Sequence, residues 1–379
     1  MTSNNVVLIV LDAVRADHLS CYGYDRTTTP NIDRIASEGV RYEHAFSNSN
    51  WTGTAHPPIF TGELPSNSGI YSGDLSFSDD TMLLTELLKE SGYRTFATSA
   101  GAYIRQDHGY DRGFDVFQQT HRIRPTLETV GKLFKESPYR KQVLFSLTRG
   151  PDDKTLYKFE SLKKFIDSDD DPFFAFFNCK TAHTPYNPPR PYKSMYCPEL
   201  KRPPFELLER FYSAVGMQTQ KLSGADIDKC RTDPGHFMTD EYNLTQDEWD
   251  VVKSWYDGAI SYLDYRIGRF VDALRKRGEL ENTYLIITAD HGEMFGEHGL
   301  TQHKYSLYDT LLHVPLIIRP PDPIDGRVLS DRVSLVDLFS TILDMTDTNI
   351  PDRTHSRSLL PLRDEQFDGY TFAETGKQD

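Results

Sequence analysis

An uninterrupted apolar run, Val6–Leu11, decides the fold class before anything else in the sequence, and it ends at Asp12. A strand with one face in water alternates apolar and polar residues. A run without alternation is typical of a central strand that is buried on both faces of a parallel sheet. Strand-like and helix-like segments alternate along much of the remaining chain, which is the signature of layered α/β folds. We therefore predict an α/β protein with a mostly parallel central sheet between helix layers.

Apolar periodicity and turn residues locate the expected elements. The clearest helix covers residues 255–276, where apolar side chains recur with a period near 3.6 and Gly278 follows. Two further helices are expected at residues 29–36 and 81–92. Further strands are expected at residues 39–42, 93–98, 173–177, 283–288 and 314–318.

The same pattern predicts the domain organisation. We expect one catalytic α/β domain over residues 1–345 and a C-terminal tail over residues 346–379, with one strand at residues 370–373. Two segments, at about 120–170 and 188–250, are rich in charge or proline and break the alternation. Because neither is bounded by a clear linker, we interpret both as insertions that cover the strand ends.

Composition excludes several classes of protein. Lys and Arg number 42 against 56 Asp and Glu, a net charge of −14, which argues against a general nucleic-acid binder. The four cysteines are too scattered for a disulfide framework. No apolar run approaches the roughly 18 residues of a membrane span, and no basic residue precedes Val6. We expect a cytoplasmic protein without a membrane span; the oligomeric state is left open.

Metal-type ligands follow two of the expected strands. Asp12 follows the first strand, and Asp290-His291 follow the strand at 283–288. Ligands of parallel α/β sheets bind beyond the carboxyl ends of the strands, so two carboxylates and an imidazole there indicate a divalent metal site. The structural alternatives are a helix-capping role for Asp12 and a turn with a capping aspartate for Asp290.

A hydroxyl-rich segment, residues 49–62, turns apolar after Thr54 and contains Thr52. One interpretation of a threonine before a helix start is an N-cap. The other is a nucleophile, because backbone N–H groups at a helix start attract an anion and a hydroxyl beside a metal has a lowered pKa.

These pieces resemble, in order, a sulfatase-type member of the alkaline phosphatase superfamily. The similar segments are Val6–Asp12, Arg15–Gly23, Thr29–Asp33, Phe60–Gly62, Gly109–Asp115, His183–Tyr186, Asp290–Glu293, and Lys304 followed by Val314–Arg319. They span roughly residues 5–375. The resemblance implies the fold of that family, and the chain ends near the point where the family's small C-terminal sheet would begin.

The resemblance also implies roles for individual residues. Asp12, Asp290 and His291 match metal-site positions, and Thr52 falls at the nucleophile position with its oxygen on the metal. His183 matches the histidine that serves the leaving group, and Lys304 matches the lysine that neutralises the sulfate or phosphate oxygens. Taken alone, His183 in a proline-rich loop and Lys304 also fit ordinary surface or structural residues. The neighbouring His298, His303 and His313 fit packing roles, with His303 the best spare ligand.

Three departures from the family change the expected chemistry. Sulfatases convert a Cys or Ser in a Cys/Ser-x-Pro-x-Arg pattern into formylglycine, whereas this chain has Thr52 at that position and His56 in the arginine's place. Threonine cannot form the aldehyde, so no formylglycine is expected. Ala13 replaces a second Asp ligand, and the family's Lys and His are not evident at residues 99–107.

With one ligand missing, we expect one divalent ion (Mn²⁺, Zn²⁺ or Ca²⁺) bound by Asp12, Asp290, His291 and Thr52. A mixed oxygen and nitrogen set with a histidine favours a transition metal over calcium.

Finally, the adjacent Pro57 and Pro58 are expected in the first turn of a helix, because prolines deeper inside would break it.

The leading hypothesis is a metal-dependent hydrolase that cleaves a small sulfate or phosphate ester by in-line attack of Thr52. Family resemblance favours sulfate and the Thr nucleophile favours phosphate. A second hypothesis is transfer of the group to a sugar or lipid alcohol instead of water. A third is a non-catalytic relative that binds sulfated or phosphorylated glycans, motivated by loss of the Cys/Ser and Arg.

Overall fold

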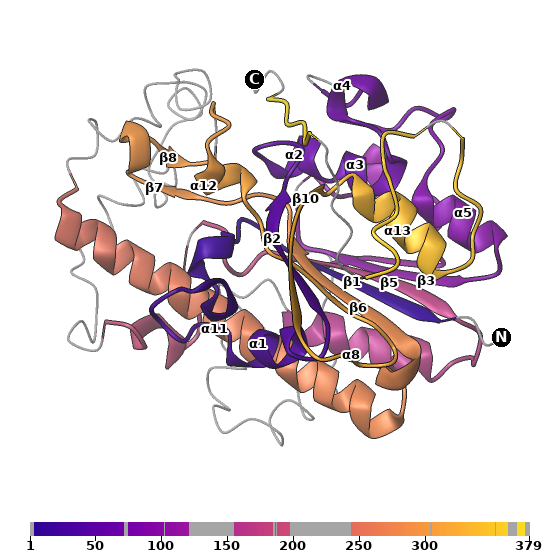
Figure 1. Ribbon diagram of the computed structural model, residues 1–379, viewed down its shortest axis with the longest axis horizontal. Helices are drawn as coiled ribbons and strands as arrows, with labels where there is room; N and C mark the ends of the chain where they lie inside the picture. Colours follow the sequence, from indigo (N-terminus) through magenta and orange to yellow (C-terminus); the bar gives the residue numbers. More distant parts are fainter. Residues whose placement is uncertain are drawn as a thin grey trace.

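The computed structural model describes residues 4–71, 75–101, 103–120, 155–184, 186, 188–197, 244–303, 305–352, 354–362 and 370–375. Within these residues, an eight-stranded sheet with the order β10-β2-β9-β6-β1-β5-β3-β4 forms the centre of the molecule (Figure 1). The strands are β1 (Asn5–Leu11), β2 (Val40–Phe46), β3 (Arg94–Ser99), β4 (Val116–Gln119), β5 (Phe173–Cys179), β6 (Thr283–Ala289), β9 (Leu316–Arg319) and β10 (Arg327–Ser334). A separate two-stranded ribbon pairs β7 (Met294–Phe295) with β8 (Thr301–Gln302).

The sheet is mostly parallel, as the sequence predicts. β1 pairs in parallel with β5 on one side and with β6 on the other. β9 alone among the paired strands of this sheet runs antiparallel to both of its neighbours, β2 and β6. All seven residues of β1 are buried, as expected for a central strand covered on both faces.

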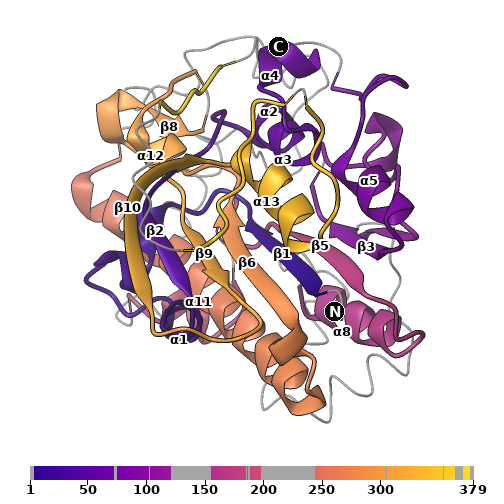
Figure 2. The same ribbon diagram turned by 45° about the vertical axis from the view of Figure 1, so that its right-hand side comes forward.

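Helices cover both faces of this sheet (Figures 1 and 2). One layer consists of α1 (Pro30–Ala36), α8 (Thr155–Ile166) and α11 (Gln246–Arg277). The opposite layer contains α3 (Pro57–Thr61), α5 (Leu84–Glu90) and α13 (Asp337–Met345). The shorter helices α2 (Thr52–Ala55), α4 (Pro65–Ser68) and α12 (Asp309–Leu312) lie in the connections. The predicted α/β fold class is therefore confirmed.

The long helix α11 begins at Gln246, well before the predicted start near Trp255. A capping box sets this start, because the Thr245 side chain accepts the Glu248 N–H while the Glu248 carboxylate accepts the Thr245 N–H. Gly278 ends the helix at φ 74°, a left-handed conformation that glycine adopts without strain. The start of α11 therefore lies inside the segment that we interpret as an insertion.

The predicted insertion at about 120–170 also needs correction where it is described. Residues 155–166 form α8, which packs against β5 and β3 and so belongs to the helix layer under the sheet. Residues 121–154 and 198–243, which make up most of both predicted insertions, lie outside the described residues.

The strand predicted at residues 370–373 does not form, and described residues 370–375 pair with no strand. Tyr370 and Phe372 are 89% and 61% exposed. These two aromatic side chains therefore pack on no core face that would hold the segment as a strand. Hydrogen bonds to the loop after β2 fix this segment instead: the Asn48 amide donates to the Phe372 carbonyl at 2.9 Å, and the Ser49 hydroxyl donates to the Glu374 carbonyl at 2.7 Å.

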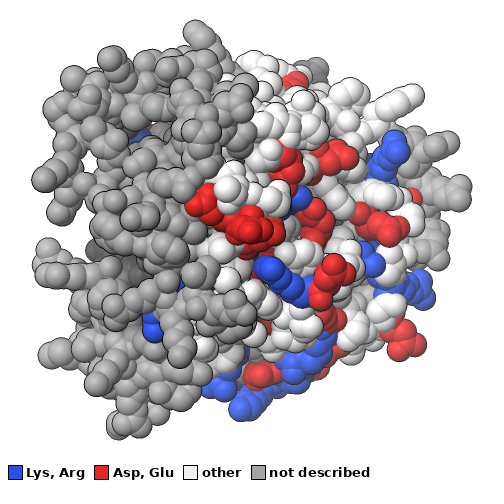
Figure 3. Space-filling model, turned by 90° about the vertical axis from the view of Figure 1, so that its left-hand side faces the viewer, with Lys and Arg blue, Asp and Glu red and all other residues white. Residues whose placement is uncertain are grey.

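The described surface on the side of β7, β8 and the start of α11 carries acidic and basic side chains interspersed (Figure 3). Of the helices that are described, none combines the length and the apolar character needed to cross a membrane.

Candidate metal and active site

Strand register brings the predicted ligands to one edge of the sheet. Leu11 at the end of β1 pairs with Cys179 at the end of β5 and with Ala289 at the end of β6. The next residue after each strand is therefore Asp12, Lys180 or Asp290. This is the carboxyl edge of parallel strands, where open α/β sheets bind their ligands.

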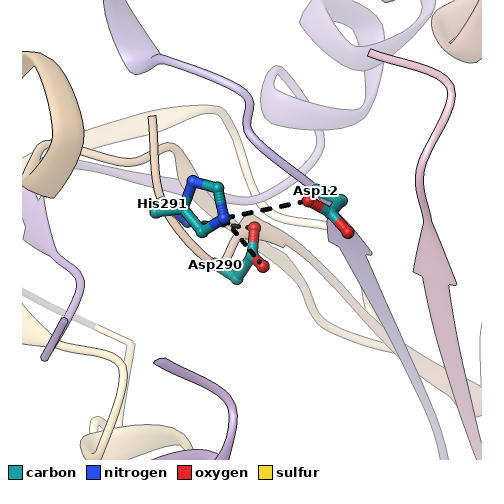
Figure 4. A group of neighbouring side chains, drawn as sticks. All are labelled: Asp12, Asp290 and His291. Carbon is teal, nitrogen blue, oxygen red and sulfur yellow. Dashed lines mark hydrogen bonds and ion pairs between the residues drawn. The ribbon is translucent and has the colours of Figure 1, made fainter. Parts of the chain in front are cut away.

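Asp12, Asp290 and His291 form one buried cluster. One donor atom of each lies within 4.8 Å of the others. His291 Nε2 lies 3.8 Å from Asp12 Oδ1 and 3.5 Å from Asp290 Oδ2, and Figure 4 shows the imidazole facing both carboxylates. The side chains of all three are at most 1% exposed. Two carboxylates and an imidazole converging in this way are a donor set for a divalent ion.

The hydrogen bonds around the cluster fit a metal. Asp12 Oδ1 and Asp290 Oδ2 are buried and have no hydrogen-bond partner, a costly arrangement unless a cation binds them. The second oxygen of Asp290 accepts the backbone N–H groups of Ala13 at 3.1 Å and His291 at 3.0 Å. His291 Nδ1 donates to the Gly292 carbonyl at 2.8 Å, so Nε2, which faces the carboxylates, is the ring nitrogen that a metal would bind.

The charges in this cluster favour a bound cation. Burial raises the pKa of Asp290, and the negative charge of Asp12 raises it further. Burial would raise the pKa of Asp12 as well, but the opposing positive charges of His183 and Lys180 lower it below its usual value. Two buried carboxylates therefore resist ionising together, and a divalent ion between them would remove this penalty.

Thr52 lies against the cluster. Its Oγ1 is 3.2 Å from His291 Nε2, and the residue is 4% exposed. The N-cap interpretation of this threonine is wrong, because Trp51 occupies the N-cap position of α2 and Thr52 is the first helical residue. The hydroxyl thus faces the metal-type ligands instead of capping the helix.

His56 lies next to the same cluster. Its Nδ1 lies 3.1 Å from the Thr52 carbonyl oxygen and 3.5 Å from Asp290 Oδ2, and the residue is fully buried. Burial lowers the pKa of His56. The helix restarts directly after it, with Pro57 and Pro58 in the first turn of α3 as predicted.

His183 is carried by the loop after β5 and lies beside a further imidazole, that of His303, at 5.0 Å between ring centroids. Its Nδ1 donates to the Thr184 carbonyl at 2.8 Å, and burial lowers the pKa of His183 to about 4. Lys304, the other residue expected to contact the transferred group, lies outside the described residues. His298 stacks on Tyr308 and His313 bonds the Glu43 carbonyl, so both have the packing roles that the sequence favours.

Three residues at this edge are not among the predicted site residues. Asn178, near the end of β5, donates to Asp12 Oδ2 at 3.4 Å, while its own Oδ1 is buried without a partner. Lys180 supplies positive charge next to Asp12, and Glu293 binds His303 at 3.0 Å. Glu293 follows directly on the Asp290-His291-Gly292 run, so its position next to predicted ligands was the available signal.

Ala13, directly after Asp12, has an unusual backbone conformation. Its φ is 63°, a left-handed conformation that costs energy for a residue with a Cβ. This conformation points its N–H to Asp290 Oδ1 and its carbonyl to the Tyr256 hydroxyl, at 3.1 and 2.8 Å. Residue 13 therefore orients the Asp290 carboxylate through its backbone.

Comparisons with known proteins agree with this architecture. The Sulfatase family model matches residues 4–348. N-acetylglucosamine-6-O-sulfatase of Bacteroides thetaiotaomicron is 24% identical, covering 96% of this chain and 71% of its own length. Iduronate 2-sulfatase of Homo sapiens is 25% identical, covering 92% of this chain and 70% of its own length.

Among solved structures, the phosphonate monoester hydrolase of Agrobacterium radiobacter has a similar fold. Its TM-score is 0.69 at 21% identity, over 94% of this chain and 76% of that one. The family match covers most of the chain, including Asp12, Thr52, His183 and Asp290-His291. The chain belongs to the sulfatase family of ester hydrolases.

Proposed function

We propose that this chain is a metal-dependent hydrolase that cleaves a sulfate or phosphate ester by in-line attack of Thr52. The observation that carries the proposal is the contact between Thr52 Oγ1 and His291 Nε2, at 3.2 Å, inside a cluster with two unpartnered carboxylate oxygens. A hydroxyl packed against metal-type ligands has the surroundings of an activated nucleophile. A structural threonine at a helix start would instead cap the helix.

The donor set fits one divalent ion held by Asp12, Asp290 and His291, with Thr52 beside it. When bound, such an ion would supply Lewis-acid chemistry, lowering the pKa of the Thr52 hydroxyl and neutralising charge on the substrate oxygens. The imidazole ligand favours Mn²⁺ or Zn²⁺ over Ca²⁺. Because threonine cannot form the formylglycine aldehyde, the nucleophile of the proposed reaction is the unmodified hydroxyl.

In the proposed reaction, the Thr52 hydroxyl gives up its proton to water, and Oγ1 forms a bond to the sulfur or phosphorus atom as the bond from that atom to the bridging ester oxygen breaks. The departing alcohol takes a proton, for which His183 is the proposed donor. The pKa of His183 is about 4 without substrate, and a bound anionic group would favour its charged form. Water then releases sulfate or phosphate from Thr52. From the sequence, Lys304 is the proposed cation for the non-bridging oxygens.

The choice between sulfate and phosphate rests on different observations. Two of the similar relatives are N-acetylglucosamine-6-O-sulfatase and iduronate 2-sulfatase, whose names are those of sugar sulfatases, and this favours a sulfated sugar as substrate. A nucleophilic threonine favours phosphorus chemistry, and a phosphonate monoester hydrolase has a similar fold. We therefore propose sulfated sugars as the first substrate class and phosphate esters as the second.

The proposed nucleophile is tested by Thr52→Ala, with Thr52→Ser as the matched control. We expect Thr52→Ala to lose at least roughly 10³-fold in kcat on the best substrate of a panel of aryl sulfate, sugar sulfate, phosphate monoester, phosphodiester and phosphonate ester. Thr52→Ser keeps the hydroxyl and should retain measurable turnover. Equal rates for Thr52→Ala and the unsubstituted protein would refute the mechanism.

A further inference from the structure

Glu293 is a fully buried carboxylate to which the proposed reaction assigns no role. It lies in the connection between β6 and β7, just after the metal-type ligand His291. Burial raises the pKa of Glu293, so a carboxylate at this position has an energetic cost. What this carboxylate binds therefore decides what it contributes to the site.

Glu293 receives hydrogen bonds from two separate segments of the chain. Its Oε1 lies 3.0 Å from Nδ1 of His303, which follows β8. Its Oε2 accepts the Thr184 hydroxyl at 3.2 Å, and the Tyr186 hydroxyl also bonds this carboxylate. Thr184 and Tyr186 belong to the loop after β5, and their hydroxyl oxygens are 3.1 Å apart. The carboxylate thus joins the loop after β5 to the turn that follows β6.

Thr184 connects this carboxylate to His183. The Nδ1 of His183 donates to the Thr184 carbonyl at 2.8 Å. Because a carbonyl can only accept, this bond assigns the proton to Nδ1 and leaves Nε2 as the ring nitrogen directed elsewhere. The side chain of the same threonine bonds Glu293. Thr184 therefore links the imidazole to the carboxylate, through its backbone on one side and its hydroxyl on the other.

Apolar packing also holds this loop. The Tyr186 ring lies 5.5 Å from the Tyr256 ring and 5.6 Å from the Phe295 ring, centroid to centroid. Apolar packing is non-directional, whereas a hydrogen bond restricts both distance and angle. The buried carboxylate thus adds a defined orientation to a loop that apolar contacts already hold in place.

We propose that Glu293 is a positioning residue for the leaving-group step: it acts through Thr184 to hold the His183 imidazole where proton transfer to the departing alcohol requires it. This inference rests on the proposed function, in which His183 is the proton donor. Misplacement of a reacting group by about 1 Å can lower a rate by roughly 10²-fold. Loss of the link to Glu293 should therefore impair proton transfer and leave the attack of Thr52 intact.

The sharpest test is Thr184→Val, which removes the hydroxyl that bonds Glu293 and keeps a branched side chain of similar shape. Rates are measured on esters of the acid group that the unsubstituted protein hydrolyses best, from para-nitrophenyl through phenyl to an alkyl alcohol. Nitrophenolate departs with little help from an acid, whereas an alkoxide needs a proton. We expect kcat/KM to stay within about 3-fold on the nitrophenyl ester and to fall about 10- to 100-fold on the alkyl ester.

Glu293→Gln tests the carboxylate itself. An amide has one acceptor oxygen, so it cannot accept from His303 and from Thr184 at the same time, and the same dependence on the leaving group is expected. A His183→Ala background separates positioning from general structure. Without the imidazole, Thr184→Val should lower kcat/KM for the phenyl ester by less than about 3-fold further. Equal losses on all esters, or an undiminished effect in the His183→Ala background, would overturn the proposal.

Two matched controls make the same chemical changes elsewhere. Thr28 is a buried threonine whose hydroxyl donates to the His18 carbonyl at 2.6 Å, and Glu297 between β7 and β8 binds Arg15 at 2.7 Å. We expect Thr28→Val and Glu297→Gln to change the rates on all esters by one common factor of less than about 3-fold. Far-UV circular dichroism checks that every variant is folded. A leaving-group dependence in either control equal to that of Thr184→Val would contradict the proposal.

The proposed function and this inference fail in different ways. If the esters are hydrolysed but the variants lose activity uniformly, the inference fails and the proposed function stands. If the unsubstituted protein hydrolyses no ester, nitrogen NMR of the histidine-labelled protein still reads the tautomer of His183, whose signal His183→Ala assigns. We expect the Nδ1-protonated form in the unsubstituted protein and a mixture of both tautomers in Thr184→Val. Identical His183 signals in the two proteins would overturn the inference.

Discussion

Two pairs of buried aspartates in this molecule have opposite surroundings. We call Asp12 and Asp290 the strand-end pair, and Asp257 and Asp264 on α11 the helix pair. Each of the four is at most 1% exposed. Yet each member of the strand-end pair has a carboxylate oxygen without a partner, whereas both oxygens of each member of the helix pair accept hydrogen bonds.

The helix pair is satisfied by the protein itself. Asp257 binds His18 Nδ1 at 2.7 Å, the Tyr24 hydroxyl at 2.8 Å and the Arg26 guanidinium at 2.6 Å. Asp264 accepts the Ile32 N–H at 2.8 Å and the Asn31 amide at 2.7 Å, and so caps the start of α1 from a different helix. Burial alone therefore does not mark a functional carboxylate. The feature that distinguishes the strand-end pair is a buried carboxylate oxygen that accepts no hydrogen bond from the protein.

The largest expected effect comes from Asp290→Asn, which tests whether the strand-end pair binds the metal. We expect loss of at least roughly 10²-fold in kcat/KM together with loss of bound metal, because an amide is a weaker ligand. The unfolding free energy without metal should stay equal or rise by about 1 kcal/mol, because the variant removes a charge that burial and Asp12 disfavour. Elemental analysis by mass spectrometry and chemical denaturation measure the two effects. Unchanged metal content would show that the cluster is not the binding site.

The helix pair should respond in the opposite way. We expect Asp257→Asn to lower the unfolding free energy by about 3 kcal/mol, because it leaves the buried partners of the carboxylate incompletely paired. Bound metal and kcat of the folded fraction should remain within about 3-fold. Urea denaturation checks the first quantity. A stable Asp257→Asn variant that has lost its metal would reverse the assignment of the two pairs.

The smallest expected effect is on pH dependence and concerns Asp264. Burial raises the pKa of Asp264 to about 6 from 3.8, against the donors that bind it. The folded protein then holds this proton more tightly than the unfolded chain, so stability falls as pH rises from 3.8 to about 6. Asp264→Asn should flatten this segment of the curve by about 2 kcal/mol relative to the unsubstituted protein. Parallel curves from pH 4 to 7 would contradict the raised pKa.

Much of the fold was predictable because its signals are local. Val6–Leu11 identified a central strand, and Pro57 and Pro58 were assigned correctly to the first turn of α3. The start of α11 and the role of α8 were mispredicted. Both segments carry many charged surface residues, and which of their sides is buried depends on tertiary packing. The aromatic alternation at 370–373 suggested a strand, but no core face is available to it.

The candidate site divides in the same way. Asp12 and Asp290-His291 stood out in the sequence because each follows a recognisable strand, and Thr52 because of its place in the family resemblance. Asn178 and Lys180 were not predicted, because an amide or an ammonium has no distinctive local pattern, and Glu293 was not singled out although it directly follows the predicted ligands. Their positions depend on contacts between residues far apart in the chain, such as that between Asn178 and Asp12.

Apolar runs and turn residues alone determined that this chain forms a layered α/β sheet and which residues follow its strands, since those features depend on neighbours in sequence. Only the folded structure decided that the ends of β1 and β6 lie in register, that Thr52 faces His291 instead of capping α2, and that Glu293 holds His303. The physical reason is desolvation: whether a buried polar atom finds a partner depends on the tertiary packing of distant segments, which no local pattern encodes.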